Sequence, residues 1–294
     1  MNPAPLRRQQ RVFFALAALI ATALWCERVS AAPSSDKSEY SLLSPTPKDQ
    51  LRSLCTDRPT KSTGPCTVDA GHWQLESDLY NITVQRAPGA TATTELFTNP
   101  TLKLGLTNTI DFEANITPFE RMTVKDHGVT ARASSVGDLF LRLKANLVGD
   151  DGGMIALAIS PYIKVPTANR AIGNGAVEGG VIVPLQLNLS GSWQLLFDPE
   201  VDVLEDAGGG GKHLNTVGLV SLSKPVSKMI TLSVEFWTDT NFDPAATSTQ
   251  YSADLGAAWI PSAAPNLQFD TGVNFGLNKL TPDIQAYIGV SCRF

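Results

Sequence analysis

Apolar and polar residues alternate with a period of two along most of the chain. In the C-terminal segment "DIQAYIGVSCRF", every even position from Ile284 to Phe294 is apolar or small. The odd positions between them are polar residues, glycine or an amphipathic ring. The same alternation recurs upstream in "NLQFDTGVNFGL", "QYSADLGAAW", "ITLSVEFWTD" and "WQLLFDPEVDV". A period of two is typical of β-strands whose two faces meet different environments.

About twelve such segments follow one another from His72, and the pattern predicts a strand in each. They cover residues 72–84, 95–106, 109–119, 136–148, 154–165, 177–188, 193–204, 212–223, 229–240, 249–260, 265–277 and 283–294. Most of them are longer than the ~5–6 residues of a usual globular strand. They match the ~9–11 residues that a tilted strand needs to cross a membrane.

The connections between these segments alternate in length. The short ones are "TN", "GDDGG", "NLSG", "SKPVS" and "IPSA", and the longer ones are "QRAPGATATT", "ERMTVKDHGVTARASS", "PTANRAIGNGA", "EDAGGGG" and "TNFDPAATS". Only the last gap, "NKLTP", departs from this order. Short turns on one side and longer loops on the other are typical of outer-membrane barrels.

A soluble β-sandwich or a lipocalin-like barrel would also alternate, so the alternation alone does not decide between them. Trp73, Trp193, Tyr251 and Trp259 lie near strand ends, where the aromatic girdles of a membrane barrel sit. The even strand count fits the same class. We therefore predict an all-β fold, a single antiparallel transmembrane β-barrel of about twelve strands over residues 72–294.

The N-terminal region has the three parts of a secretory signal peptide. A basic start with Arg7, Arg8 and Arg11 precedes an apolar run from Val12 to Trp25, and small residues follow. That run is short of the ~20 residues of a membrane-spanning helix. We expect residues 1–31 to be removed, leaving residues 32–71 as a short segment before the barrel. The expected location is the cell outer membrane.

Composition and charge restrict the possible functions less than the strand pattern does. The chain has 23 basic and 28 acidic residues, and the signal peptide contains four of the basic and one of the acidic ones. The rest therefore carries 19 basic and 27 acidic residues, a formal net charge of −8. Nucleic acid is excluded as a partner, because proteins that bind it present a basic face.

A closed barrel pairs its last strand with its first, so that no strand edge meets lipid. The terminal "YIGVSCRF" resembles the last strand of Gram-negative outer-membrane proteins, which generally end on Phe. This resemblance implies that Phe294 is a membrane-insertion signal read by the outer-membrane assembly machinery. Cys292 stands where Tyr is common in those strands.

If the apolar faces meet lipid, the opposite faces line the lumen. The inward acids would be Glu76, Asp78, Asp111, Glu113, Asp138, Glu178, Asp198, Glu200, Asp202, Glu235, Asp239, Asp254, Asp270 and Asp283. The inward bases would be Lys103, Arg142, Lys144, Lys164 and Arg293. Two interpretations stay open: an ordinary polar lumen with local ion pairs, or a cation-preferring or ligand-binding constriction around "DPEVD".

Residues 32–71 show no alternation and are rich in Ser, Pro, Thr and Lys. This segment is either a periplasmic tail or an insert in the lumen, where Arg52, Arg58 and Lys61 would complement the acids. Cys55 and Cys66 bracket a Pro/Gly/Thr loop, and in an oxidising compartment we expect them to form a disulfide. A metal site is poorly supported, because neither histidine nor a third cysteine lies at ligand spacing.

Three stretches carry a family resemblance: "CTDRPTKSTGPCTVDAGHWQLESDLYN", "DPEVDVLEDAGGGGKH" and the last strand. They resemble the MetA-pathway of phenol degradation family of bacterial outer-membrane β-barrel transporters. The Cys-bounded "DRPTKS" is the most specific part of the match. The resemblance implies passive uptake of small molecules, including aromatic or hydrophobic compounds, with the lipid bilayer and small solutes as partners.

Two other classes of function fit the sequence less well. An outer-membrane hydrolase of the phospholipase kind needs a Ser–His pair, but His213 is followed two residues on by Asn215 and His127 lies in a loop. No Gly-x-Ser-x-Gly motif occurs, and "AGGGGK" lacks the P-loop pattern. A structural or adhesive barrel is the second alternative, although its loops are short for a receptor surface. We predict no enzymatic activity and no cofactor.

Overall fold

A computed structural model describes residues 37–294, so the expected signal peptide lies outside the described residues. The strand segments are β1 (Trp73–Ala87), β2 (Ala90–Gly105), β3 (Ile110–Ile116), β4 (Phe119–Asp126), β5 (Val129–Ser135), β6 (Leu139–Val148), β7 (Ile155–Val165), β8 (Glu178–Ile182), β9 (Leu185–Asn188), β10 (Gln194–Phe197), β11 (Glu200–Glu205), β12 (Lys212–Pro225), β13 (Ile230–Asn241), β14 (Ser248–Trp259), β15 (Leu267–Gly276) and β16 (Ile284–Arg293). Two three-residue 3-10 turns, η1 (Lys48–Gln50) and η2 (Ser190–Ser192), accompany them.

These segments form twelve antiparallel strands, because four strands are each interrupted once. The pairs β3 with β4, β5 with β6, β8 with β9, and β10 with β11 are the two halves of one strand each. Pro118, Pro184 and Pro199 lie at three of the four breaks. Proline has no backbone N–H to donate to a neighbouring strand, which explains why the ladder stops there. The predicted strand count and fold class are confirmed.

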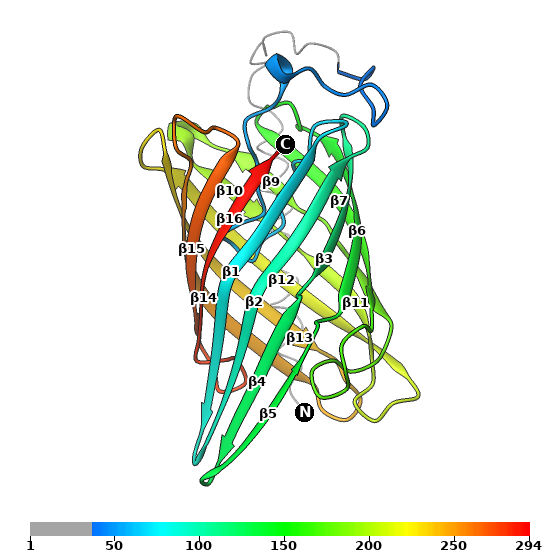
Figure 1. The fold of residues 1–294 in the computed structure, drawn as a ribbon, viewed down its shortest axis with the longest axis vertical. Coiled ribbons are helices and arrows are strands. Elements are labelled where there is room, and N and C mark those ends of the chain that lie inside the picture. The colour runs from blue at the N-terminus through cyan, green and yellow to red at the C-terminus, as the bar shows by residue number, and fades with distance from the viewer. Residues whose placement is uncertain (1–36) are drawn as a thin grey trace, which may run out of the picture. The chain divides into compact units, whose positions relative to one another are not determined.

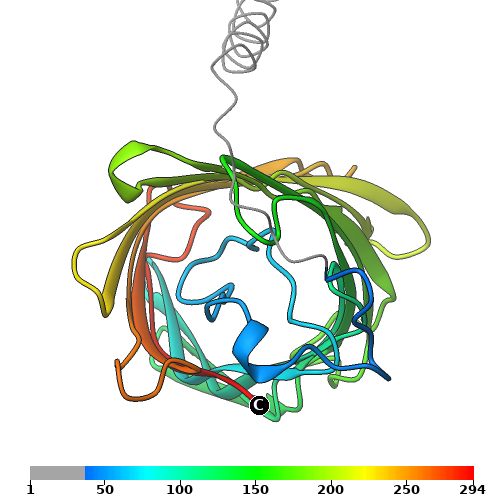
Figure 2. The same ribbon diagram turned by 90° about the horizontal axis from the view of Figure 1, so that it is seen from above.

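The sheet closes on itself. β1 pairs with β2 on one side and with β16 on the other, where Leu75 lies opposite Cys292. The backbone N–H of Phe294 donates to the carbonyl of Trp73 at 2.8 Å, so the last residue joins this seam. Figure 2 shows the resulting ring viewed from above. The role of Phe294 as an insertion signal stays a prediction.

The two faces of the barrel have the reverse polarity of a soluble protein. Leu102 is 41% exposed on the outside, whereas its neighbour Lys103 is 4% exposed and faces the lumen. The same contrast holds between Leu143 and Lys144. An apolar outer surface around a polar interior is the arrangement of a transmembrane barrel. The protein is an outer-membrane β-barrel.

Among residues 37–294, no helix is long and apolar enough to cross a membrane.

A β-bulge changes which residues face the lumen near the middle of β1 and β2. The register shifts between Asp78 and Tyr80, and Thr98 on the partner strand has a positive φ of 63°. Beyond this point Tyr80 and Phe97 turn outward, and their rings lie 5.4 Å apart. A bulge inserts one unpaired residue, so the strict period of two is broken at that point.

Two of the predicted long loops are wrong, because the structure pairs their residues as strands. The expected loop over 85–94 contains only the turn Pro88–Gly89 between β1 and β2, and the loop over 120–135 contains only the turn His127–Gly128 between β4 and β5. His127 and Gly128 both have positive φ, which suits a tight two-residue turn. The two hairpins extend beyond the other strands at one end of the barrel (Figure 1).

Candidate functional site

The lumen contains a loop from the N-terminal segment. We call residues 55–66 the Cys loop, because Cys55 and Cys66 form a disulfide with their Cα atoms 6.5 Å apart. Figure 2 shows the N-terminal segment crossing the interior of the ring. Within the loop, the backbone N–H of Gly64 donates to Asp57 Oδ1 at 2.7 Å. A disulfide and a hydrogen bond within the loop thus stabilise it in addition to its contacts with the barrel wall.

Arg52 anchors the segment that leads into this loop. Its side chain lies 2.9 Å from Asp151 Oδ1 and 3.3 Å from Asp150 Oδ2, both in the turn between β6 and β7. Burial would raise the pKa of Asp151, but hydrogen bonds from Arg52, Asn108 and Lys37 outweigh it and lower this pKa to about 2. The anchor is therefore an ion-pair cluster at the short-turn end of the barrel.

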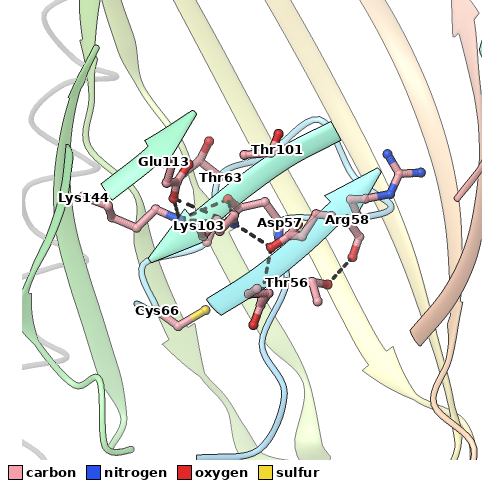
Figure 3. A network of polar contacts seen from close by, with 12 residues as sticks. Thr56, Asp57, Arg58, Thr63, Cys66, Thr101, Lys103, Glu113 and Lys144 are labelled. Carbon is pink, nitrogen blue, oxygen red and sulfur yellow. Dashed lines mark hydrogen bonds and ion pairs between the residues drawn. The ribbon is translucent and has the colours of Figure 1, made fainter. Parts of the chain in front are cut away.

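Asp57 lies at the centre of a polar network that joins the Cys loop to the barrel wall (Figure 3). Its Oδ2 lies 2.5 Å from Lys103 Nζ of β2 and 3.0 Å from Lys144 Nζ of β6. Lys103 also pairs with Glu76 at 2.6 Å, and Lys144 pairs with Glu113 at 3.1 Å. Both lysines are buried. A buried ammonium needs a carboxylate partner, so this wall and the Cys loop complement each other.

Arg58 joins the loop to the seam of the barrel. Its guanidinium lies 2.6 Å from Asp78 Oδ1 on β1 and 2.7 Å from Asp270 Oδ1 on β15. A Cβ added to Gly289, on the strand between these two, would overlap the Arg58 side chain. Glycine at this position is what leaves room for the guanidinium.

The tip of the Cys loop, residues 61–63, meets the opposite wall. The backbone N–H of Lys61 donates to Glu235 Oε2 at 2.9 Å, and the Ser62 hydroxyl donates to Oε1 at 2.9 Å. The backbone N–H of Thr63 donates to Asp198 Oδ2 at 2.6 Å. The loop therefore spans the lumen, from the β2 and β6 wall to the β10–β13 wall.

Cavities lie on both sides of the tip along the same wall. A cavity of about 340 Å³ near the short-turn end includes Ser221, Ser223, Thr231 and Ser233 of β12 and β13 in its lining. Further along the same two strands, a cavity of about 170 Å³ includes Leu219 and Trp237. The contact of the tip with Glu235 falls between them. The tip therefore lies between two cavities on the same wall.

The acids and bases were predicted to face the lumen from strand parity, that is, from whether their positions fall on the polar face of the alternating pattern. The structure places them in the lumen, but only some of them form ion pairs. Most form ion pairs within 4.0 Å: Lys103, Lys144 and Arg142 with Glu76 or Glu113, Lys164 with Asp138 and Glu178, Asp78 and Asp270 with Arg58, Asp254 with Lys61, and Arg293 with Asp69. Asp283 lies at the rim beside Arg86. Six of the predicted luminal acids in residues 37–294 have no ion pair: Asp111, Asp198, Glu200, Asp202, Glu235 and Asp239.

Five of those six carboxylates lie close together on β11, on β13 and between β10 and β11, around the tip of the Cys loop. Ion pairs lie on both flanks of this group, Lys164 with Glu178 on β7 and β8 and Lys61 with Asp254 on β14. The interpretation of a cation-preferring or ligand-binding constriction stays a prediction. Strand parity could not identify Asp57 or Thr63, because neither residue belongs to a strand.

Within the described residues, no group of three or more His, Cys, Asp or Glu side chains is arranged to hold a metal ion.

A family model decides the relationship to known proteins. The model described as "Putative MetA-pathway of phenol degradation" matches residues 56–294. The chain belongs to this family. The match begins inside the Cys loop and runs through the last strand, so it includes both the loop tip and the wall that the tip contacts. A comparison with curated proteins found no match.

Solved structures resemble this chain at low sequence identity. The outer membrane channel described as COG4313 from Pseudomonas putida F1 is 13% identical with a TM-score of 0.61, covering 82% of this chain and 100% of its own. The translocator domain of the autotransporter NalP from Neisseria meningitidis is 15% identical with a TM-score of 0.47, covering 81% and 90%. At this identity the likeness to the Pseudomonas putida channel shows the fold alone.

Proposed function

We propose that this barrel is a passive channel for small solutes across the outer membrane and that the tip of the Cys loop forms its constriction. The observation that carries the proposal is the position of the tip between two cavities along β12 and β13. The cavities lie before and after Glu235, and Lys61 and Ser62 of the tip donate hydrogen bonds to Glu235. We assign the short-turn end and the Cys loop entry to the periplasmic side, as barrel architecture favours.

The carboxylates without an ion pair make the channel selective for the charge of the solute. Asp198, Glu200 and Asp202 face the lumen without an ion pair, so their field attracts cations and repels anions. Neutral solutes are not excluded by this field. The rings of Phe140 and Tyr162 lie 6.2 Å apart beside the same acids and can stack on a small aromatic molecule.

Three lines support aromatic compounds as a solute class. The aromatic rings lie beside the constriction, the family description names phenol degradation, and the polar interior offers partners to a hydroxyl group. Such a channel needs only weak binding, because a solute must also leave it.

Planar-bilayer recordings of the purified barrel test the proposal. Discrete conductance steps in KCl are expected, together with swelling of liposomes in solutions of small neutral solutes. Heat-modifiable migration on gels is the control for folding. A correctly folded barrel that gives neither conductance nor swelling would show that it has a structural role rather than a transport role.

A further inference from the structure

The cavity beyond the loop tip combines aromatic rings with two carboxyl groups that form no ion pair. It has a volume of about 170 Å³, and its lining includes Phe140, Tyr162 and Trp237 as well as Asp198 and Glu200. A cavity of roughly 150 Å³ holds one benzene-sized ring. The space therefore suits a single aromatic ring with a short substituent.

The charges at this cavity favour a cation. Two bases also line it, but Lys61 pairs with Asp254 at 3.3 Å and Arg142 pairs with Glu113 at 3.0 Å. Asp198 and Glu200 have no ion pair among the described residues. Asp198 is 5% exposed, and its Oδ1 has no hydrogen-bond partner. A buried carboxylate oxygen without a partner is costly, and a positively charged donor removes that cost.

The lumen already contains one bound ammonium group at the edge of this cavity. Lys61 Nζ lies 4.1 Å from the centroid of the Trp237 ring and donates to the Ser252 hydroxyl at 2.8 Å. An aromatic face with a nearby carboxylate is a recognised arrangement for organic ammonium ions. The loop's own lysine thus places an ammonium group against the face of Trp237, with Asp254 of β14 as its carboxylate partner.

We infer that the cavity binds aralkylammonium ions, with the ring between Phe140, Tyr162 and Trp237 and the ammonium at Asp198 and Glu200. The inference deepens the proposed channel function and rests on it, because a solute reaches this cavity only through the lumen. Each solute of this class carries a positive charge and an aromatic ring.

Binding to the purified full barrel in detergent tests this site, with benzylammonium as the probe in isothermal titration calorimetry. Benzyl alcohol and benzoate are matched in size and differ in charge. Benzylammonium is expected to bind more tightly than either. The double variant Asp198→Asn, Glu200→Gln should weaken its binding about tenfold, as expected for the loss of charged acceptors. Glu205→Gln, on the same strand but outside the cavity, should leave it unchanged.

Equal binding of benzyl alcohol, tighter binding of benzoate, or unchanged affinity in the double variant would each overturn the inference. If the double variant does not show heat-modifiable migration, Glu200→Gln alone and Trp237→Leu replace it, and both should weaken binding. Conductance in KCl is measured on the same preparation. Conductance without selective binding contradicts the ammonium site alone, whereas binding without conductance contradicts the channel alone.

Discussion

Asp57 on the Cys loop lies 3.0 Å from the ammonium of Lys144 on β6, a side chain that is completely buried in the barrel wall. Lys103 Nζ of β2 lies 2.5 Å from the same carboxylate oxygen, Oδ2. A single loop residue therefore bridges two lysines of the wall. This bridge explains how a segment without secondary structure is held in one place inside the lumen.

Replacing Asp57 with Asn should release the Cys loop. Removing one partner of a buried ion pair leaves the other charges uncompensated, and the expected loss of docking free energy is roughly 3 kcal/mol. We expect a larger single-channel conductance and faster proteolysis within residues 55–66. Asp49→Asn removes the same charge at an exposed position of η1 and should change neither. Unchanged conductance and unchanged proteolysis in Asp57→Asn would contradict this account of docking.

Reducing the disulfide should loosen the same loop by a different route. Cys55 and Cys66 are 11 positions apart, and closing a loop of this length contributes about 3 kcal/mol in the chain-entropy model. Treatment of the folded barrel with a reductant, or the double variant Cys55→Ser, Cys66→Ser, should increase conductance and its fluctuations. Cys292→Ser serves as the control, because Cys292 is free. Alkylation of both loop thiols in the non-reduced protein would show that no disulfide forms.

The fold was largely predictable because the membrane imposes one pattern on every strand. A lipid-facing side chain such as Leu102 must be apolar and its neighbour Lys103 is free to be polar, so parity alone assigns both. Parity fails at bulges, since Leu79 inserts a residue that no spacing rule anticipates. It also fails at the β4–β5 hairpin, whose polar residues are paired by backbone hydrogen bonds rather than by an apolar face.

The site was less predictable for a related reason. Strand parity identified Asp198 and Glu235 as luminal residues, but not the backbone N–H groups of Thr63 and Lys61 from which they accept hydrogen bonds. Those contacts join residues more than 130 positions apart in the sequence. The excess of acids on the strands gave a general reason to expect a basic segment in the lumen. Nothing in the sequence indicated that Asp57 would bridge two lysines.

Acid should weaken the anchor at the short-turn end. The pKa of Asp151 is lowered to about 2 in the folded protein, below the ~4 of an unfolded chain. A lowered pKa stabilises the fold above about pH 4, and this contribution is lost as the pH falls toward 2. We expect proteolysis-resistant docking of residues 37–52 to decline over that range, measured by acid-tolerant protease digestion and mass spectrometry. The decline should be smaller in Asp151→Asn.

The neighbouring Asp150 is a matched comparison for that titration. Burial raises the pKa of Asp150, although Arg52 and Thr67 oppose this effect. A raised pKa stabilises the fold at low pH and loses its contribution as the pH rises. Asp150→Asn should therefore leave the decline between about pH 4 and 2 in place. A decline that persists in Asp151→Asn and disappears in Asp150→Asn would contradict the assignment.

Cation preference should depend on the uncompensated acids of the wall beside the loop tip. The triple variant Asp198→Asn, Glu200→Gln, Asp202→Asn converts to amides three carboxyl groups that have no ion pair among the described residues. Folding should persist, because the amide oxygen introduced by Asp202→Asn can still accept from the Tyr162 hydroxyl, which donates to Asp202 Oδ1 at 2.8 Å. The cation-to-anion permeability ratio should fall by about threefold, equivalent to roughly 0.7 kcal/mol.

Reversal potentials under a salt gradient measure this ratio. The matched control Asp126→Asn, Glu205→Gln, Asp283→Asn converts the same number of carboxyl groups to amides at more exposed positions near the rim. Mobile ions screen such positions over about 10 Å at 0.1 M salt, so the control should shift the reversal potential less. Equal shifts in both triple variants would mean that net charge alone sets selectivity. An unchanged reversal potential in the wall variant would show that Asp198, Glu200 and Asp202 do not face the path of the ions.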